Sequence, residues 1–423
     1  MIKALSVDGF LDFLKSREIL NFKYEDTVKD IIKNVREQGD KYVIELTRKF
    51  DKVESKDFFL KVTEKEYEQA FAEISPELLE IFKEAKSNIY EFHRNQLPLN
   101  WNYSRSETTL GQIVNPIEKV GLYVPGGLGF YPSSVLMNAI PALVAGVPEI
   151  YLATPPRPDG SIHPSVLVCA SLCGIKNVYK TGGAQAIAAF TFGTETIPQV
   201  HKVTGPGNMY VTLAKKILFG YIDIDSIAGP SEVMILADEN SRLEYIVHDF
   251  FAQSEHSDDA QSVLLLPNQN LADKFVAILT EKLDKSERKE ILMKSLSRNG
   301  IIVIYNNREE AYRCINEYAP EHLQIIPEID FAEISRKVKN AGAIFLGEYT
   351  PVSMGDYFAG TNHTLPTGGT AKFSSPLGVY DYVKFSSVLK YSKQDFLKVK
   401  DKIAAFAKHE NFFEHARCVE IRD

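Results

Sequence analysis

The feature that most constrains the fold is an alternation of short β-type segments with helical stretches. Between residues 110 and 204 the β-type segments are IVNPIEKVGLYV, EIYLA, NVYK and KVT, and stretches such as SSVLMNAIPALVAG and HPSVLVCASLCG separate them. Short strands that alternate with helices form βαβ units, because parallel neighbours need a crossover connection. This part of the chain therefore predicts a doubly wound parallel sheet.

A second alternation follows residue 240. SRLE at 241–244 matches a helix capping box, and the apolar stripe after it predicts a helix reaching about Glu255. SVLLLP, IIVIY and GAIFLG are then the strands of a second set. Apolar spacing from 26 to 97 is helical, and the tail from Ser392 predicts two helices. The predicted fold class is α/β, with two Rossmann-like doubly wound parallel-sheet domains and small helical N-terminal and C-terminal segments.

A chain of 423 residues is too long for one ordinary core, so more than one domain is expected. We place a helical N-terminal segment at 1–22 and a C-terminal helical tail at 376–423. The first Rossmann-like domain is discontinuous and takes 23–122 and 233–375. The second Rossmann-like domain takes 123–232.

Composition and charge exclude several classes of protein. The net charge of −8 argues against nucleic acid, whose phosphates need a basic surface. The start has no continuous apolar region and carries Asp8 and Asp12, so no export signal is expected. VLMNAIPALVAGV is too short for a membrane span, which needs about 20 residues. We expect a cytoplasmic protein without membrane contact. The sequence contains no CxxC pair, so the common motif for structural zinc is absent.

Glycine-rich loops follow the predicted strands, and they read PGGLGFYPSS, TGGAQ, GPGN and AGPSE. Doubly wound sheets bind ligands at the carboxyl ends of their strands, and glycines before a helix N-terminus suit a pyrophosphate or a carboxylate. The dinucleotide motif GxGxxG is absent, however. The loops predict an anionic or polar small ligand, and helix capping is the alternative.

Polar residues that suit catalysis or metal binding are scattered. Gln253 and His256 share a helix face, Glu321 and His322 are adjacent, and GDYFAGTNHTLPTGG at 355–369 holds Asp356 and His363 between glycines. Each group taken alone also fits ordinary surface or loop residues. The terminal sequence HENFFEHARC is no metalloprotease motif, because Phe413 stands where HExxH has its second histidine.

Taken together, the segments resemble one family. YVPGG, GGAQAIAAFTFG, GPGN, AGPSE, YAPEHL and GDYFAGTNHTLPTGG, with Gln253, His256, Glu410 and His415, resemble the histidinol dehydrogenases in order and spacing. The resemblance covers essentially the whole chain and has no departure at a functional position.

The resemblance implies an enzyme that oxidises L-histidinol to the aldehyde and then to L-histidine with two NAD, the last steps of histidine biosynthesis. It implies a homodimer with one zinc per subunit and shared sites, in which the tail docks on the partner subunit. The zinc ligands would lie in the first domain and the tail, and NAD on the second domain. The implied catalytic bases are Glu321 and His322. The implied zinc ligands are Gln253, His256, Asp356 and His415, and these four residues and His322 would also contact the substrate. Further substrate contacts would be Ser231, His363 and Glu410, and the NAD contacts would be Tyr123, Gln185 and Asn208.

The chemistry of these residue types fits the implied reaction. His322, with an ordinary pKa near about 6.5, would take the alcohol proton, and Glu321 would activate water for the second oxidation. Two alternatives stay open. One is a different NAD-linked zinc alcohol dehydrogenase, although the cysteine ligands usual there are absent. The other is a non-catalytic binder of a small anion.

Overall fold

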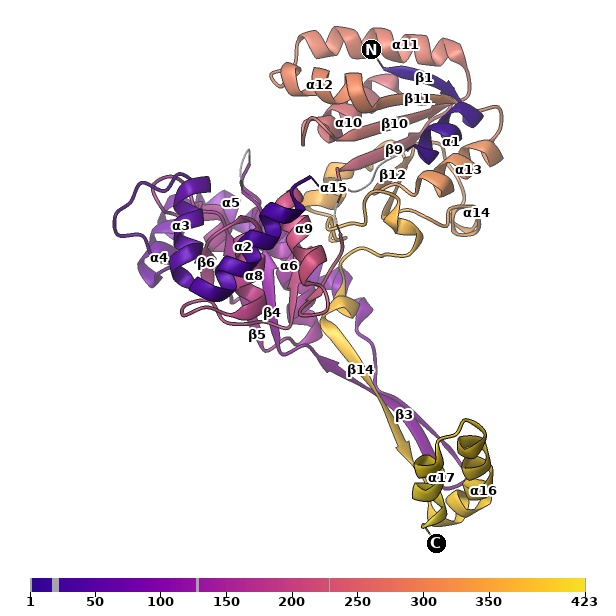
Figure 1. Ribbon diagram of the computed structural model, residues 1–423. Helices are drawn as coiled ribbons and strands as arrows, with labels where there is room; N and C mark the ends of the chain where they lie inside the picture. The colour runs from indigo at the N-terminus through magenta and orange to yellow at the C-terminus, as the bar shows by residue number, and fades with distance from the viewer. Residues whose placement is uncertain (1, 17–22, 127–128, 228, 423) are drawn as a thin grey trace.

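The computed structural model describes residues 2–16, 23–126, 129–227 and 229–422. Figure 1 shows two α/β units next to each other and a thin arm that leaves them and carries the C-terminal helices. Each unit is built on a parallel sheet, whereas the arm is antiparallel. The two parallel-sheet units confirm the predicted fold class.

The larger sheet has the strand order β1-β11-β10-β9-β12-β13, and all neighbouring strands are parallel. Its central strands are buried along their length, because helices cover both faces. One apolar core forms around Phe10 and Tyr318, and another around Phe250 and Phe275. The elements are β1 Lys3–Ser6, α1 Val7–Lys15, β9 Glu232–Leu236, α10 Leu243–Ser254, β10 Gln261–Leu266, α11 Gln269–Asp284, α12 Lys289–Asn299, β11 Gly300–Ile304, α13 Arg308–Tyr318, β12 His322–Ile325, α14 Phe331–Lys337, β13 Ala343–Leu346 and α15 Val352–Tyr357.

The smaller sheet has the strand order β6-β5-β4-β7-β8, also parallel throughout. Helix α6 is buried on nearly every side, which explains why its sequence is apolar without a polar face. The elements are β4 Lys119–Tyr123, α6 Pro132–Ala145, β5 Glu149–Thr154, α7 Pro164–Leu172, β6 Val178–Lys180, α8 Gly183–Phe192, β7 Lys202–Thr204, α9 Met209–Leu218 and β8 Asp223–Ile224. The strands and helices expected from 119 to 224 are therefore present.

The helices between 25 and 93 pack on the smaller sheet. Val28 of α2 shares a core with Phe190 of α8, and Ile89 of α5 shares one with Ile140 of α6. The predicted boundaries differ here, because they gave 23–122 to the domain that holds 233–375. An apolar stripe predicts that a helix packs against a core, but it does not indicate which of the two sheets the helix covers. The elements are α2 Glu25–Gln38, α3 Asp40–Phe50, α4 Glu64–Glu73, α5 Pro76–His93 and the 3-10 helix η1 Arg94–Gln96.

The N-terminal segment contributes a strand as well as the expected helix. Strand β1 pairs with β11 at the edge of the larger sheet, and Ser6 caps α1 by accepting a hydrogen bond from the Gly9 N–H. Residues 3–15 are thus part of the larger unit. Met1 and residues 17–22 of the predicted segment lie outside the described residues.

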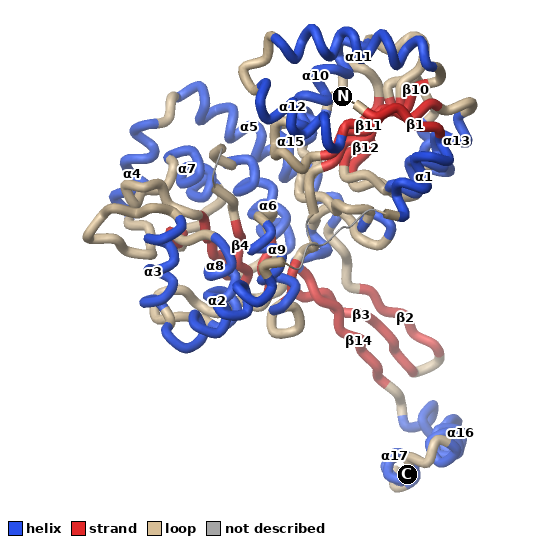
Figure 2. Tube along the Cα trace, turned by 45° about the horizontal axis from the view of Figure 1, so that its top comes forward, coloured by secondary structure: helices blue, strands red, loops and turns tan. Residues whose placement is uncertain are grey.

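The arm is an antiparallel sheet that the sequence did not predict. It consists of β2 Trp101–Arg105, β3 Thr108–Pro116 and β14 Val383–Lys390, in the order β14-β3-β2. Figure 2 shows it projecting from the body with the tail helices at its far end. Those helices, α16 Lys393–His409 and α17 Phe413–Glu420, confirm the expected pair, and the 3-10 helices η2 Thr370–Lys372 and η3 Val379–Tyr382 precede β14.

The expected capping box at 241–244 is wrong. Helix α10 begins at Leu243 after Arg242, and no side chain caps it. Ser241 instead accepts a hydrogen bond from the Asp238 N–H and donates one to the Asp238 carboxylate, so a local turn uses its hydroxyl. No helix of the described residues is both long and apolar enough to cross a membrane.

Candidate active site

The predicted bases lie at the start of β12, where the backbone of the adjacent strand holds both. Glu321 precedes the strand, His322 is its first residue, and both side chains are buried. The Glu232 N–H donates to Glu321 Oε2 at 2.7 Å, and the Glu232 carbonyl lies 2.9 Å from His322 Nδ1. One peptide segment at the start of β9 therefore positions both candidate bases.

The hydrogen bond to Glu232 fixes the tautomer of His322. A carbonyl only accepts, so Nδ1 carries the proton and Nε2 has a free lone pair. Nε2 is buried, has no hydrogen-bond partner among the described residues, and lies 3.9 Å from Asp356 Oδ1. Burial, with smaller effects of His256 and His363, lowers the His322 pKa to about 4. His322 is thus an uncharged proton acceptor, with a pKa below the ordinary value expected from sequence.

Glu321 has the opposite perturbation. Burial raises the pKa of its carboxyl group well above the ordinary value. The hydrogen bond from the Glu232 N–H lowers this pKa, whereas the charges of Glu232 and Asp356 raise it further. Burial also raises the pKa of Asp356 to about 7. The surroundings thus shift the pKa values of Glu321 and His322 in opposite directions, which is typical of sites that transfer protons.

The body supplies three of the four predicted zinc ligands. Gln253 lies in the last turn of α10, His256 follows that helix, and Asp356 lies in α15. The Gln253 side chain is buried, and its amide oxygen is the atom that could bind a metal. His256 is close enough to lower the pKa of both His322 and His363. The imidazole and the carboxylate are usual zinc ligands, and the amide oxygen is a less common one.

Within the described residues, no three His, Cys, Asp or Glu side chains are grouped closely enough to hold a metal. The predicted zinc ligands do not form such a group, because Gln253 is an amide and His415 lies on the tail. His415 is in α17, and Glu410 ends α16, so the two belong to different helices. Figure 1 places both helices at the end of the arm, away from the larger sheet. Glu410 and His415 therefore do not join the other residues within one chain.

The glycine-rich segment 355–369 bridges the two units. Its first residues belong to helix α15, although the sequence suggested irregular structure throughout. On one side, the Asn362 amide donates to the Met137 carbonyl of α6 at 2.7 Å. On the other side, the Gly368 N–H donates to the Glu232 carboxylate at 2.8 Å. His363 lies between these anchors, and burial lowers its pKa to about 4. The segment thus brings Asp356 and His363 to the bases.

The predicted catalytic residues gather at the amino ends of the larger sheet's strands. Glu321 and His322 begin β12, Ser231 immediately precedes β9, and Gln253 lies where α10 returns to that edge. The sequence argument expected chemistry at carboxyl ends. That rule holds for the smaller sheet, whose glycine-rich loops form the other half of the site.

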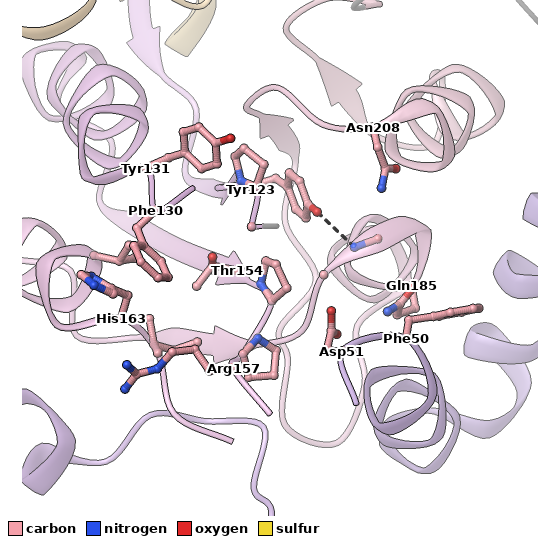
Figure 3. Close-up of a pocket in the computed structure, with 18 of the residues that line it drawn as sticks. Phe50, Asp51, Tyr123, Phe130, Tyr131, Thr154, Arg157, His163, Gln185 and Asn208 are labelled. Carbon is pink, nitrogen blue, oxygen red and sulfur yellow. Dashed lines mark hydrogen bonds between the residues drawn. The ribbon is translucent and has the colours of Figure 1, made fainter. Parts of the chain in front are cut away.

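A hollow of about 880 Å³ lies at the carboxyl ends of the smaller sheet and includes all three predicted NAD contacts (Figure 3). Tyr123 ends β4, and its hydroxyl oxygen accepts a hydrogen bond from the Gly183 N–H at 3.1 Å. Burial raises the Tyr123 pKa to about 12, so the phenol stays neutral. Gln185 is buried in α8, and Asn208 caps α9 by accepting from the Tyr210 N–H at 3.0 Å. The size suits a large ligand such as a dinucleotide.

A buried ion pair supports the loop that presents Asn208. Lys215 of α9 donates to Asp225 Oδ1 and to the Gly205 carbonyl, and the Gly205 N–H donates to Asp225 Oδ2 at 2.7 Å. Gly205 has φ +116°, and a Cβ there would lie 1.9 Å from the Tyr123 carbonyl oxygen. The loop after β7 is therefore fixed against Tyr123.

Segment 355–369 also connects the bases with the hollow. Tyr131 lines the hollow and lies immediately before α6, and the Asn362 amide of the segment donates to the Met137 carbonyl of that helix. Asp356 of the same segment lies 3.9 Å from His322 Nε2. The Tyr131 side of the hollow is therefore linked to the segment that carries Asp356.

Two residues of the site escaped the sequence analysis. Glu232 positions both bases through its backbone and carries no motif, although it follows Ser231 in AGPSE. Asp51 lines the hollow from the end of α3, far from any glycine-rich loop in sequence. Only spatial proximity could have identified them.

Glycine-rich loops around a dinucleotide-sized hollow, next to a buried carboxyl and imidazole pair, define a dinucleotide-dependent oxidoreductase. A family model described as histidinol dehydrogenase matches residues 14–423. The chain belongs to the histidinol dehydrogenase family.

Individual relatives agree over the full length. Histidinol dehydrogenase of Oceanobacillus iheyensis is 47% identical over 409 residues, covering 96% of this chain and 95% of the relative. That of Bacillus subtilis is 46% identical over 423 residues, covering 100% and 98%. The crystal structure of histidinol dehydrogenase from Elizabethkingia anophelis matches with a TM-score of 0.93 and 34% identity, covering 100% of this chain and 98% of that one.

Proposed function

We propose that this protein oxidises L-histidinol through L-histidinaldehyde to L-histidine with two NAD. The observation that supports it best is the state of His322, a buried neutral imidazole whose Nε2 is free and lies beside Asp356. The neighbouring hollow is large enough for NAD, and the family is shared over the whole chain.

In the first oxidation, His322 Nε2 takes the hydroxyl proton of the alcohol. Its protonated Nδ1 stays bound to the Glu232 carbonyl, which keeps the imidazole oriented as charge develops. NAD, which Tyr123, Gln185 and Asn208 would hold, would supply the acceptor for the hydride of the carbinol carbon. The alcohol thereby loses one hydride and one proton and becomes the aldehyde.

In the second oxidation, water must add to the aldehyde before another hydride can leave. Glu321 takes a proton from that water, since a carboxylate with a raised pKa is a stronger base than an ordinary one. His322 then takes the hydroxyl proton of the hydrate. The Glu232 N–H holds Glu321 Oε2, which leaves the other carboxylate oxygen for the water.

Zinc would be held by Gln253, His256 and Asp356, with His415 as the fourth ligand. When bound, it would supply a positive centre for the amine and imidazole nitrogens of histidinol and so orient the substrate. Ser231, His363 and Glu410 would complete the substrate contacts. The burial of Gln253 at the end of α10, three residues before His256, supports this assignment.

His415 and Glu410 would come from the partner subunit of a two-fold dimer. The tail exposes large apolar side chains, with Phe406 66%, Phe413 62% and Ile421 71% exposed, which a monomer would leave in water. A second hollow, of about 830 Å³, borders α15 and is lined in part by Met354, Phe373 and Tyr380. The partner's tail would fill it and bring His415 to the zinc.

The test is the stoichiometry of NAD reduction. With L-histidinol and NAD, two NADH should form for each histidine, and chelation should abolish the reaction until zinc is added back. One NADH with release of the aldehyde would indicate a simple alcohol dehydrogenase. Binding without reduction would indicate a non-catalytic anion binder. Either result would overturn the proposed function.

A further inference from the structure

Asp51 is an acidic side chain in the cofactor hollow for which the structure provides no partner. It ends helix α3, and its N–H donates to the Thr47 carbonyl at 2.9 Å. The carboxylate oxygen Oδ2 is buried and has no hydrogen-bond partner within the part of the chain that the structure describes. Burial raises the Asp51 pKa to about 7. A carboxylate that loses water without gaining a partner is costly to keep in a fold.

The surroundings of Asp51 place it against the glycine-rich loop before α8. Thr47, one turn earlier in α3, bonds through its hydroxyl to the Thr181 hydroxyl at 3.0 Å, immediately before Gly182 and Gly183. Asp51 also contributes to the raised pKa of Tyr123, whose hydroxyl binds the Gly183 N–H. Helix α3 therefore brings a carboxylate to the start of α8, where N–H groups and the helix dipole suit a pyrophosphate.

A carboxylate only accepts hydrogen bonds, so its ligand must donate. In a dinucleotide the vicinal hydroxyls of a ribose offer two adjacent O–H donors, which match the two oxygens of one carboxylate. Other dinucleotide-binding folds use an acidic residue for the same hydroxyls, about 20 positions after their glycine motif. In the smaller unit the acidic residues at that spacing are Glu149 after PGGLG and Asp225 after GPGN, and they bind Tyr151 and Lys215 and do not line the cofactor hollow. Asp51 comes instead from the end of a helix that precedes the whole sheet.

The position of Asp51 selects the adenosine ribose. The nicotinamide must lie toward Tyr131, because Asn362 binds the Met137 carbonyl of the helix that Tyr131 precedes, and Asp356 of the same segment lies 3.9 Å from His322 Nε2. Figure 3 shows Asp51 beside Gln185, on the other side of Tyr123 from Tyr131. The end of the cofactor that carries no reacting atom therefore falls near Asp51.

We propose that Asp51 binds the 2′- and 3′-hydroxyls of the adenosine ribose and thereby makes the enzyme select NAD over NADP. A 2′-phosphate would remove one of the donors and place negative charge against the carboxylate. The inference rests on the proposed function in taking NAD as the ligand.

The variant Asp51→Asn tests the inference, because it keeps the shape and removes the charge. Hydrogen bonds to a charged group contribute about 1.5–3 kcal/mol, so NADH affinity should fall roughly 10- to 100-fold. NADPH affinity should fall less or rise, so the NADH-to-NADPH preference should fall at least tenfold. Both affinities are measured by nucleotide fluorescence on the zinc-loaded enzyme, without turnover. Asp57→Asn is the matched control, since Asp57 is exposed and does not line the hollow.

The stability of the free enzyme provides a second readout. Removing an unpaired, half-buried charge should raise the Tm of Asp51→Asn by about 2 °C or more in the absence of nucleotide. A fall of that size would mean that the carboxylate stabilises the fold and would overturn the inference. An unchanged NADH-to-NADPH preference would overturn it too. If Asp51→Asn changes that preference while histidinol is not oxidised, the inference stands and the proposed function fails.

Discussion

Replacing Lys215 with methionine should destabilise the smaller unit severely. The Lys215 and Asp225 side chains are only 3% and 4% exposed, and their charged atoms are in hydrogen-bond contact. Methionine keeps most of the apolar stem but leaves Asp225 as a buried charge without its cation. Breaking a buried pair in this way costs about 3–5 kcal/mol. For a unit of this size the Tm should fall by roughly 10 °C.

Lys202 offers a matched control in the same sheet. Its side chain is 6% exposed, and its ammonium lies 2.9 Å from Asp223 and 3.9 Å from Asp381, whose side chains are 49% and 31% exposed. Water can reach both carboxylates when Lys202→Met removes the cation, so the loss should be about 1 kcal/mol. The double variant Lys215→Met/Asp225→Asn should regain most of the stability, because no buried charge remains.

Thermal unfolding followed by fluorescence measures all three variants, and NADH titration reports on the hollow. Lys215→Met should also weaken NADH binding, since Lys215 and Asp225 hold Gly205 in the loop that presents Asn208. Equal Tm losses for Lys215→Met and Lys202→Met, or a loss below about 1 kcal/mol for Lys215→Met, would refute the reasoning from burial.

Three further predictions concern the bases, the cofactor loop and the tail. Glu321→Gln should slow oxidation of histidinaldehyde more than that of histidinol, whereas His322→Asn should impair both oxidations. If separate half-reaction assays show equal losses for Glu321→Gln, the proposed roles of Glu321 and His322 are wrong. Gly205→Ala should lower the Tm and abolish NADH binding, because its Cβ would overlap the Tyr123 carbonyl at a φ of +116°; a fully stable, NADH-binding variant would contradict that. Asp395→Ala should speed tryptic removal of the tail, because Asp395 accepts hydrogen bonds from Ser106, Thr108 and the Glu107 N–H. The Lys398 ammonium, together with these smaller contacts, lowers the Asp395 pKa to about 2. The wild-type attachment should therefore be present at neutral pH and be lost only as pH falls from about 4 through 2.

Local patterns predicted the elements well because both sheets are covered on two faces. Strands such as β10 are mostly apolar runs between helices, and α5 begins with a capping serine, Ser75, followed by Pro76, which is a usual start of a helix. The arm lacked such a signal. Strand β14 is exposed along nearly all its length and pairs with β3, more than 260 positions earlier, so neither burial nor local sequence marked it.

The site was predicted through resemblance rather than through spacing. Gln253, His322 and Asp356 come from three separate segments, and only the fold brings them together. The perturbed pKa of His322 could not be read from sequence, since it results from burial and from two other imidazoles. Glu232 positions the bases through its peptide group, which any residue type except proline could supply at that position.

Subunit complementation tests most directly whether the proposed zinc site is shared between two chains. Gln253→Ala damages the body and His415→Ala damages the tail, so each variant alone should be nearly inactive and bind little zinc. His409→Ala is the control, because His409 is an exposed histidine on the same tail and should keep full activity.

Mixing the two defective variants under conditions of subunit exchange makes about half of the dimers mixed. If each tail serves the partner, a mixed dimer has one site with both defects and one intact site. Roughly a quarter of wild-type histidinol oxidation should then return, with zinc bound in the same proportion. Demonstrated exchange without any return of activity or zinc would contradict the shared site and place His415 with its own chain.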